Sequence, residues 1–181
     1  MNTLPDGYSL RLAAESEFSS IRAFYDRLID DLAQLPHHPM WDKEGHPSDS
    51  YIRSALAGGG LWVAETGACE VAGALILNHA ANDGYKQVPW RVQAEPEQVA
   101  IVHAFGVATS HQGRGLGSAM MHHVIRLCRE AGDKAIRLDL IDLNRPTEKV
   151  YFKLGFTKCA EIELYYEEVG WQLFHMFELA L

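Results

Sequence analysis

The chain is short of cysteine, of positive charge and of long apolar runs, and each shortage excludes a class of protein. No apolar run approaches the ~18–20 residues that a membrane-spanning helix requires, and the N-terminus lacks the basic and then apolar pattern of a secretory signal. Its 16 Lys and Arg stand against 24 Asp and Glu, so the formal net charge is -8 and no basic stripe for nucleic acid is visible. We therefore expect a protein that binds neither membrane nor nucleic acid.

The three cysteines, Cys69, Cys128 and Cys159, are odd in number and show no spacing typical of metal ligands. This usage fits a reducing compartment, so we expect a cytoplasmic protein. Cys128 falls on the predicted core side of a helix, where a thiol is a poor nucleophile. His37 and His38, like the nearby His46, stand in a proline-rich segment that is more typical of a surface loop than of a metal site. We predict no metal.

The size and composition of the chain predict one globular domain over residues 1–181. The 181 residues are 48% apolar, enough to bury one core, and neither a repeat nor a low-complexity tract interrupts them. The acidic balance is compatible with a cationic substrate, but many soluble enzymes are acidic and simple solubility is the better explanation.

The spacing of apolar residues predicts seven strands and four helices. Helical segments repeat in steps of three and four, and strands are short apolar or alternating runs bounded by Gly, Pro and Asn. Strands are expected at Ser9–Ala13, Leu61–Glu65, Val71–Asn78, Val99–Val107, Ala135–Ile141, Thr157–Glu163 and Gln172–Leu181, and helices at Phe18–Leu35, Ser48–Leu56, Leu116–Ala131 and Pro146–Leu154. This order favours an α/β or α+β fold around one mostly antiparallel sheet, with a crossover near the glycines that precede residue 118.

A glycine-rich stretch, His111-Gln112-Gly113-Arg114-Gly115-Leu116-Gly117-Ser118, separates the apolar strand 99–107 from an amphipathic helix. Glycines at such a junction let the backbone turn tightly and leave the first N–H groups of the helix uncovered. Those donors lie at the positive end of the helix dipole, which favours a phosphate. A dinucleotide-binding Gly-x-Gly-x-x-Gly motif fits less well, because its third glycine position holds Ser118. The stretch therefore predicts a phosphate-bearing ligand.

A second motif follows about 30 residues later, Asn144 with Tyr151-Phe152-Lys153-Leu154-Gly155-Phe156. Together the two motifs resemble the GNAT family of acyl-CoA-dependent N-acyltransferases. Residues 112–117 are similar to its pyrophosphate loop, Gln/Arg-x-x-Gly-x-Gly/Ala, and the second motif to its Asn…Tyr-x-x-Leu-Gly-Phe signature. The resemblance covers about residues 99–157 and implies a GNAT-like fold with acetyl-CoA as the acyl donor.

The same resemblance implies a set of cofactor contacts. The Phe105 amide would face the thioester carbonyl, and Val107 would pair with the amides of the pantetheine arm. Asn144 would also meet that arm, although an Asn before Arg145-Pro146 equally suits a helix N-cap. The implied cofactor-binding residues are Phe105, Val107, Gln112, Gly113, Arg114, Gly115, Leu116, Gly117, Ser118 and Asn144.

The resemblance assigns Tyr151 as the acid that protonates the departing thiolate, a role that a phenol can fill. Without the motif, Tyr151 would read as a packing residue. The general base is open: His103 is the first candidate because its ordinary pKa near ~6.5 suits the task, and Glu97 is the second. Strand alternation predicts that His103 shares a face with Phe105 and Val107. Asp139 and Asp142 read as polar residues at a strand end.

The expected activity is transfer of an acetyl or other short acyl group to a primary amine of a small molecule or peptide, by direct attack in a ternary complex. A non-catalytic acyl-CoA-binding sensor or scaffold is the alternative, and a homodimer is compatible with either. Acidic residues near aromatic ones, such as Asp26, Asp30 and Glu168, would suit a cationic acceptor. Candidate walls of the acceptor site are Tyr25, Trp41, Tyr51, Tyr85, Trp90, Tyr165 and Tyr166.

Overall fold

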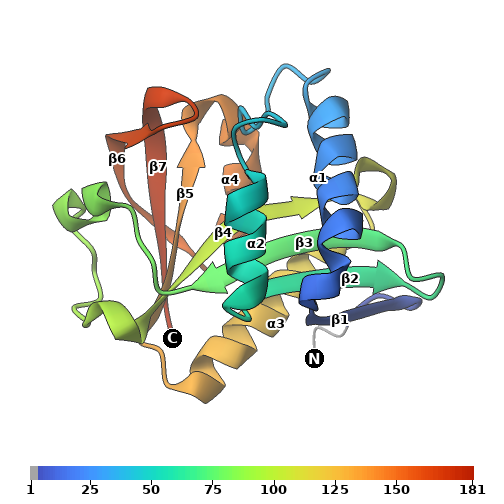
Figure 1. The fold of residues 1–181 in the computed structure, drawn as a ribbon. Coiled ribbons are helices and arrows are strands. Elements are labelled where there is room, and N and C mark those ends of the chain that lie inside the picture. Colours follow the sequence, from blue (N-terminus) through green and yellow to red (C-terminus); the bar gives the residue numbers. More distant parts are fainter. Residues whose placement is uncertain (1–3) are drawn as a thin grey trace.

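A computed structural model describes residues 4–181 and arranges them as one seven-stranded sheet with four α-helices (Figure 1). This confirms the predicted α/β class and the predicted order of strands and helices. The strands are β1 (Tyr8–Leu12), β2 (Leu61–Thr66), β3 (Val71–Asn78), β4 (Val99–Val107), β5 (Ala135–Ile141), β6 (Thr157–Tyr166) and β7 (Gly170–Ala180), and the helices are α1 (Phe18–Leu32), α2 (Asp49–Ala57), α3 (Leu116–Ala131) and α4 (Glu148–Lys153).

The sheet has the strand order β1-β2-β3-β4-β5-β7-β6. Every neighbouring pair is antiparallel except β4 and β5, which run parallel. A parallel pair needs a crossover, and α3 supplies it from the glycine-rich stretch. Within residues 4–181 no helix is long and apolar enough to span a bilayer.

The helices cover opposite faces of the sheet. Helices α1 and α2 bury their apolar sides against β2, β3 and part of β4, and we call this side the α1–α2 face. Helices α3 and α4 bury theirs on the other side, the α3–α4 face, with Met120, Val124 and Tyr151 in one cluster. Side chains therefore pack on both faces of β4, which is held from two sides.

Strands β4 and β5 pair over only three residues each and then diverge. Val99–Ile101 lie beside Ala135–Arg137, and no later residue of β4 pairs with β5 among the described residues. β4 continues along β3, and β5 continues along β7. The edge of β4 from residue 102 to 107 consequently lacks a strand partner on the β5 side.

A β-bulge interrupts β4 at the same place. Gly106 lies opposite Ala74 and His103 opposite Ile76, so two residues of β4 stand against one of β3. Ala104 adopts a left-handed backbone with φ of 46°, which a non-glycine residue seldom does. The extra residue shifts the alternation of side chains along the strand by one.

The bulge makes the predicted alternation along β4 wrong. His103 was expected on the same face as Phe105 and Val107. Phe105 and Val107 pack into the α3–α4 cluster, whereas the His103 ring lies 6.2 Å from the Tyr51 ring on the α1–α2 face. The physical reason is the inserted residue, because two positions on either side of a bulge no longer share a face.

A buried ion pair attaches the long segment between β3 and β4 to the sheet. The Arg137 Nε donates to Glu178 Oε2 at 2.9 Å, and the backbone N–H groups of Arg91 and Val92 donate to Glu178 Oε1 at 2.9 and 3.0 Å. The Arg137 guanidinium also stacks 4.3 Å from the Trp90 ring centre. Glu178 is only 3% exposed, so its partners satisfy both carboxylate oxygens in place of water.

We predict that Glu178→Ala lowers the free energy of unfolding by about 3–5 kcal/mol, because it leaves a buried guanidinium and two N–H groups without an acceptor. Urea denaturation measures the change. The control is Glu130→Ala, which breaks a surface pair with Arg126 whose members are 58% and 61% exposed; that variant should lose no more than about 1 kcal/mol. Equal losses in the two variants would contradict the role given to Glu178.

Candidate active site

The glycine-rich stretch forms an exposed loop at the start of α3. Gly113 and Gly115 have φ of 75° and 80°, a left-handed conformation that glycine adopts without strain. No atom lies within 4 Å of a Cβ built on either residue. Glycine therefore suits these positions because of the backbone conformation, and not because space is short. The loop residues Gln112 to Gly115 are exposed to solvent.

Contacts with Phe105 and Val107 hold this loop against the end of β4. A Cβ on Gly117 would lie 3.3 Å from Phe105 Cζ and 3.4 Å from Val107 Cγ2, so the absent side chain lets α3 sit close to the strand. The Gln112 amide donates to the Val107 carbonyl at 2.9 Å. The start of the helix and the free edge of β4 are thereby fixed next to each other.

The first turn of α3 is free to bind an anion. Gly115 is its N-cap and supplies no side-chain hydrogen bond to the turn. The N–H groups of Leu116, Gly117 and Ser118 precede the first i to i-4 bond, which Ala119 makes to the Gly115 carbonyl. Leu116 contributes only its backbone, since its side chain is core. The arrangement suits a phosphate, with Arg114 exposed beside it.

Tyr151 reaches the α3–α4 face from α4. Its ring lies 5.8 Å from Phe156 and 5.6 Å from Phe177, and the residue is only 6% exposed. Burial raises the pKa of the phenol, and the negative charge of Asp139 raises it further. The hydroxyl therefore carries its proton at neutral pH and can act as a donor.

Asn144 lies in the 3-10 turn Asp142–Thr147 that leads into α4. The alternative interpretation of this residue as the helix N-cap is wrong, because the N-cap of α4 is Thr147. The Thr147 hydroxyl donates to Asn144 Oδ1 at 2.9 Å and does not cap the helix. The predicted helix start at Pro146 consequently moves to Glu148.

His103 is a neutral imidazole, and one of its two ring nitrogens donates a hydrogen bond. The Asn78 side-chain oxygen accepts the Ala80 N–H at 2.9 Å, which fixes that atom as an acceptor. His103 Nε2 lies 3.0 Å from the same oxygen, so Nε2 carries the hydrogen. Burial lowers the pKa of His103, although the charge of Asp139 partly opposes it. A backbone hydrogen bond with Ala80 also opposes the shift. Nδ1 is the ring nitrogen without a hydrogen, so it is the one that can accept a proton.

The structure does not bring Glu97 to these residues. Glu97 is exposed in the 3-10 turn Pro96–Gln98, at the end of β4 where the strand still pairs with β5. At a rise of ~3.3 Å per residue, the six intervening steps place it up to about 20 Å from His103. His103, Phe105 and Val107 all lie at the diverging end.

A row of rings leads from α1 to His103 on the α1–α2 face. Neighbouring ring centres lie 5.9 Å apart for Tyr25 and Trp41, 5.9 Å for Trp41 and His46, and 5.4 Å for His46 and Tyr51. The Tyr25 hydroxyl donates to the carbonyl of Ala104, the bulged residue, at 2.8 Å. Three of the predicted wall residues therefore lie together on the α1–α2 face beside β4: Tyr25, Trp41 and Tyr51.

Asp139 has partners that the sequence does not predict. It is more than a polar residue at a strand end, because its Oδ2 accepts the hydroxyls of Tyr85 at 3.0 Å and Tyr166 at 2.6 Å. Arg137 lies beside Ile101 in the last pair of β4 and β5, and Asp139 follows it on β5. Two charged residues, Arg137 and Asp139, among the apolar residues of this strand were the available signal.

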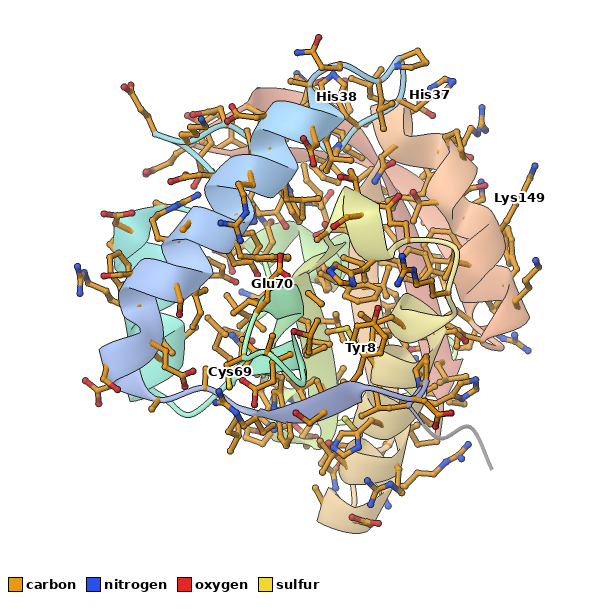
Figure 2. The ribbon with its side chains drawn as sticks, turned by 90° about the vertical axis from the view of Figure 1, so that its right-hand side faces the viewer. Tyr8, His37, His38, Cys69, Glu70 and Lys149 are labelled. Atoms are coloured by element: carbon orange, nitrogen blue, oxygen red, sulfur yellow. The ribbon has the colours of Figure 1, made fainter. Side chains whose placement is uncertain are left out.

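Other candidates lie away from this group. Asp26 pairs with Arg22 and Asp30 with Lys43. Tyr165 is 51% exposed beside Trp171. Trp90, by contrast, packs on Tyr85 with 5.4 Å between ring centres and stacks on Arg137. His37 and His38 lie in the loop after α1, at the top of the molecule in Figure 2 and away from Tyr8.

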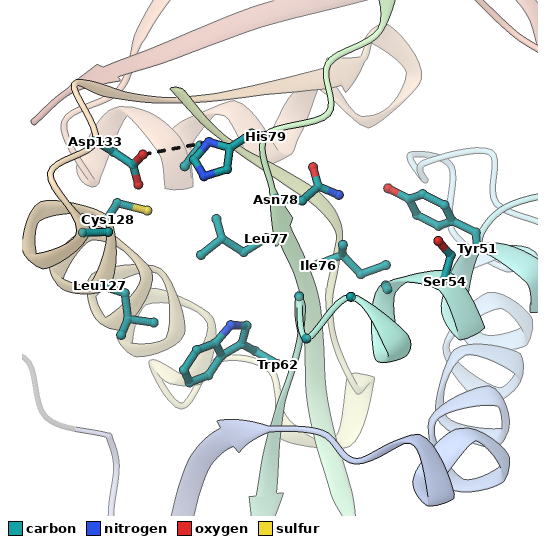
Figure 3. Close-up of a pocket in the computed structure, with 16 residues that line it drawn as sticks. Tyr51, Ser54, Trp62, Ile76, Leu77, Asn78, His79, Leu127, Cys128 and Asp133 are labelled. Carbon is teal, nitrogen blue, oxygen red and sulfur yellow. Dashed lines mark ion pairs between the residues drawn. The ribbon is translucent and has the colours of Figure 1, made fainter. Parts of the chain in front are cut away.

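A cavity of about 520 Å³ lies beyond the start of β2 and is separate from the glycine-rich loop. Figure 3 shows Tyr51 and Asn78 on one side of β3 and Leu77, Leu127 and Cys128 on the other. The thiol of Cys128 confirms the sequence prediction: the residue is 2% exposed, and burial raises the pKa of its thiol to about 12. It is therefore unsuited to be a nucleophile.

Comparison with known proteins agrees with this geometry. The family model described as the acetyltransferase (GNAT) family matches residues 21–156. A streptothricin acetyltransferase from Streptomyces lavendulae is 34% identical over 53 residues, 29% of this chain and 28% of the relative. A mycothiol acetyltransferase from Thermomonospora curvata is 34% identical over 77 residues, 40% of this chain and 25% of the relative. The matches thus span about a quarter of each relative's length.

Solved structures share the fold across nearly the whole chain. A GNAT acetyltransferase from Streptococcus agalactiae superposes with a TM-score of 0.79 at 16% identity, covering 97% of this chain and 96% of that one. An acetyltransferase from Salmonella typhimurium, solved with its cofactor acetyl-CoA, superposes with a TM-score of 0.65 at 19% identity, covering 96% and 94%.

We predict that wild-type stability falls more steeply than that of His103→Gln as pH drops below about 6.5. Burial lowers the pKa of His103 in the folded state, so the unfolded chain binds the extra proton first and folding is disfavoured in acid. The difference in slope should approach at most about 1.4 kcal/mol per pH unit. Chemical denaturation across this range measures it. Substitution of the exposed His37 by Gln is the control and should keep the wild-type slope; identical slopes for His103→Gln and wild type would contradict the neutral, buried state of His103.

Proposed function

Because the chain belongs to the acetyltransferase (GNAT) family, we propose that it transfers an acetyl or other short acyl group from acetyl-CoA to a primary amine of a small molecule or peptide. The observation that carries the proposal is the divergence of β4 and β5 beside the uncapped start of α3. The relatives support acetyl transfer in general, since their names refer to two different compounds, streptothricin and mycothiol.

The residues at the diverging end fit acetyl-CoA, which supplies an acyl thioester and leaves as a thiol. The exposed loop from Gln112 to Gly115, with the backbone of Leu116, Gly117 and Ser118, would hold the pyrophosphate. The unpaired edge of β4 offers backbone groups of Phe105 and Val107 to the pantetheine arm. Asn144, whose side chain is partly exposed, would contact the same arm.

His103 is the proposed general base. An aliphatic amine is protonated at neutral pH, and freeing its lone pair costs about 4.6 kcal/mol when its pKa is ~10.4. The imidazole is neutral because burial lowers its pKa, and its Nδ1 has no hydrogen to displace. The ammonium nitrogen loses two protons on the way to the amide. One leaves to solvent before the attack and frees the lone pair, and the other passes to Nδ1 as the bond to the acyl carbon forms. Glu97, far along the strand, has no part in this step.

Tyr151 is the proposed general acid. Its phenol keeps its proton because burial raises its pKa. That proton passes to the departing sulfur, so the products are an amide and a neutral thiol. Proton exchange with solvent then returns His103 and Tyr151 to their starting states.

The alternative, a binding module without catalysis, explains the loop but not the pair of groups in complementary protonation states. One is a neutral imidazole with a free nitrogen, and the other is a protonated phenol. We therefore favour the enzyme. Its cytoplasmic location and a homodimeric state stay predictions, and the three free cysteines accord with the former.

We predict that acetyl-CoA stabilises the protein by about 2.7 kcal/mol at one hundred times its Kd, and that Gly115→Ala removes most of this gain. Calorimetry or thermal unfolding measures it. Gly132→Ala is the matched control, because Gly132 also has a left-handed φ, 87°, at the other end of α3. Both variants should lose intrinsic stability, yet Gly132→Ala should keep the acetyl-CoA response. Absence of any response in wild type would overturn the cofactor assignment.

We predict that Tyr151→Phe and His103→Gln each lower kcat by about 10²–10⁴-fold while acetyl-CoA still binds. The pH profiles should differ: wild-type activity falls in acid as His103 becomes protonated, and His103→Gln should lack this limb. Thiol release with an accepted amine measures both. Tyr165→Phe, altered at an exposed tyrosine, serves as the control. An unchanged kcat in Tyr151→Phe, or an unchanged acid limb in His103→Gln, removes that residue from the mechanism.

A further inference from the structure

His175 is a fully buried histidine of β7, and both of its ring nitrogens face carboxylates. Nδ1 is hydrogen-bonded to Glu148 Oε1, and Nε2 lies 2.9 Å from Asp142 Oδ1. Burial would raise the pKa of Glu148, but hydrogen bonds from His175 and Lys158 outweigh it and lower that pKa. An ionised carboxylate only accepts hydrogen bonds, whereas a neutral imidazole has a hydrogen on one nitrogen alone. The geometry therefore requires an imidazolium at His175.

The charges packed around His175 balance when it is an imidazolium. In the described chain, the carboxylates within 4 Å of its ring nitrogens belong to Asp142 of the 3-10 turn, Glu148 of α4 and Glu161 of β6. Lys158 Nζ lies 3.2 Å from Glu148 and 2.7 Å from Glu161. Arg145 lies 3.6 Å from Glu161 and 4.0 Å from Asp142. These three carboxylates meet two basic side chains, and His175 supplies the third positive charge that a buried cluster needs.

Both hydrogen-bond partners of His175 belong to the segment that carries the proposed acid. Asp142 is the first residue of the 3-10 turn before α4, and Glu148 is the first residue of α4 itself. Tyr151 follows Glu148 by three residues, so the two side chains share one face of the helix. A single side chain of β7 therefore holds the turn at its start and the helix at its start.

A ring contact lies next to this ion pair. Phe177 follows His175 by two residues, so both side chains project from the same face of β7. The Phe177 ring packs 5.6 Å from the Tyr151 ring, just as His175 binds Glu148 one turn earlier on α4. The ion pair and the ring pair together determine how α4 lies along the strand.

Helix α4 has little stability of its own. It contains only six residues, and isolated helices shorter than about 12–15 residues are marginal in water. Its N-cap, Thr147, supplies no side-chain hydrogen bond to the first turn. The position of α4, and with it that of the Tyr151 hydroxyl, consequently depends on contacts with the sheet.

We infer that His175 is a positioning residue for the proposed reaction: as an imidazolium, it fixes α4 on β7 and thereby places the Tyr151 hydroxyl at the departing sulfur. This inference rests on the proposed function. His175 is fully buried and acts through Glu148 and Asp142, not on the reacting atoms. A misplacement of about 1 Å can lower a rate by about 10²-fold, so small shifts of α4 matter.

The charge state is tested in the unaltered protein. Nitrogen-15 NMR separates a ring nitrogen that carries a hydrogen from one that does not, and His175→Gln identifies the signals. We expect both nitrogens of His175 to carry a hydrogen at about pH 7.5, where a histidine in water, with a pKa near ~6.5, is mostly neutral. The exposed His37 is the reference. A nitrogen of His175 without a hydrogen at this pH would overturn the inference.

The positioning role is tested by combining His175→Gln with Tyr151→Phe. The glutamine amide can donate to one carboxylate but carries no charge. Alone, His175→Gln should lower kcat about tenfold or more. In the Tyr151→Phe background it should change kcat by less than about twofold, because the hydroxyl to be placed is absent. A purely structural role would lower kcat by the same factor in both backgrounds.

Asp142→Asn is the second variant, for the case that His175→Gln does not fold. The Asp142 side chain is 46% exposed, so its loss is tolerated more easily, and it should lower kcat only where Tyr151 is present. His37→Gln is the matched control and should leave kcat unchanged. An unchanged kcat in His175→Gln, or equal losses with and without the Tyr151 hydroxyl, would overturn the inference. A wild type that releases no thiol from acetyl-CoA with any amine would instead count against the proposed function, whereas the NMR result concerns His175 alone.

Discussion

The bulge in β4 is the constraint on which the rest of the site depends. Ala104 can hold its left-handed backbone because the surrounding structure determines it: β3 pairs on both sides of the bulge, and the buried Tyr25 hydroxyl donates to the Ala104 carbonyl. The shift turns His103 toward the α1–α2 face while Phe105 and Val107 keep the other. One inserted residue thus places the proposed base and the two residues proposed to contact the cofactor on opposite sides of the same strand.

Burial sets the protonation states that the chemistry requires. Loss of water lowers the pKa of His103 and raises that of Tyr151, so the imidazole is neutral and the phenol keeps its proton. The charge of Asp139 raises the pKa of both groups. Its two phenol partners satisfy one carboxylate oxygen without neutralising the charge.

The sequence predicted the elements well because their signals are local. Alternation and helical steps identified all seven strands and four helices, and Gly132 ends α3 as expected. The glycine loop was predicted in its observed place, since a tight turn before a helix needs residues that tolerate positive φ. The errors were also local in cause: the bulge at Ala104 broke the alternation, and the 3-10 turn before α4 moved its N-cap to Thr147.

By itself, then, the sequence determined the family, the donor loop and the identities of Tyr151 and His103 as candidates, because these depend on short motifs. Only the tertiary structure decided which side chains meet. The parallel register ends at Ile101 and Arg137, after which β4 and β5 diverge. The segments that carry Tyr85 and Tyr166 brought two hydroxyls to Asp139 on β5. Glu97 is not favoured as the general base, because it lies in the turn before β4, at the end where β4 and β5 are still paired. Contacts between residues far apart in the chain follow from packing and strand register, which no local pattern encodes.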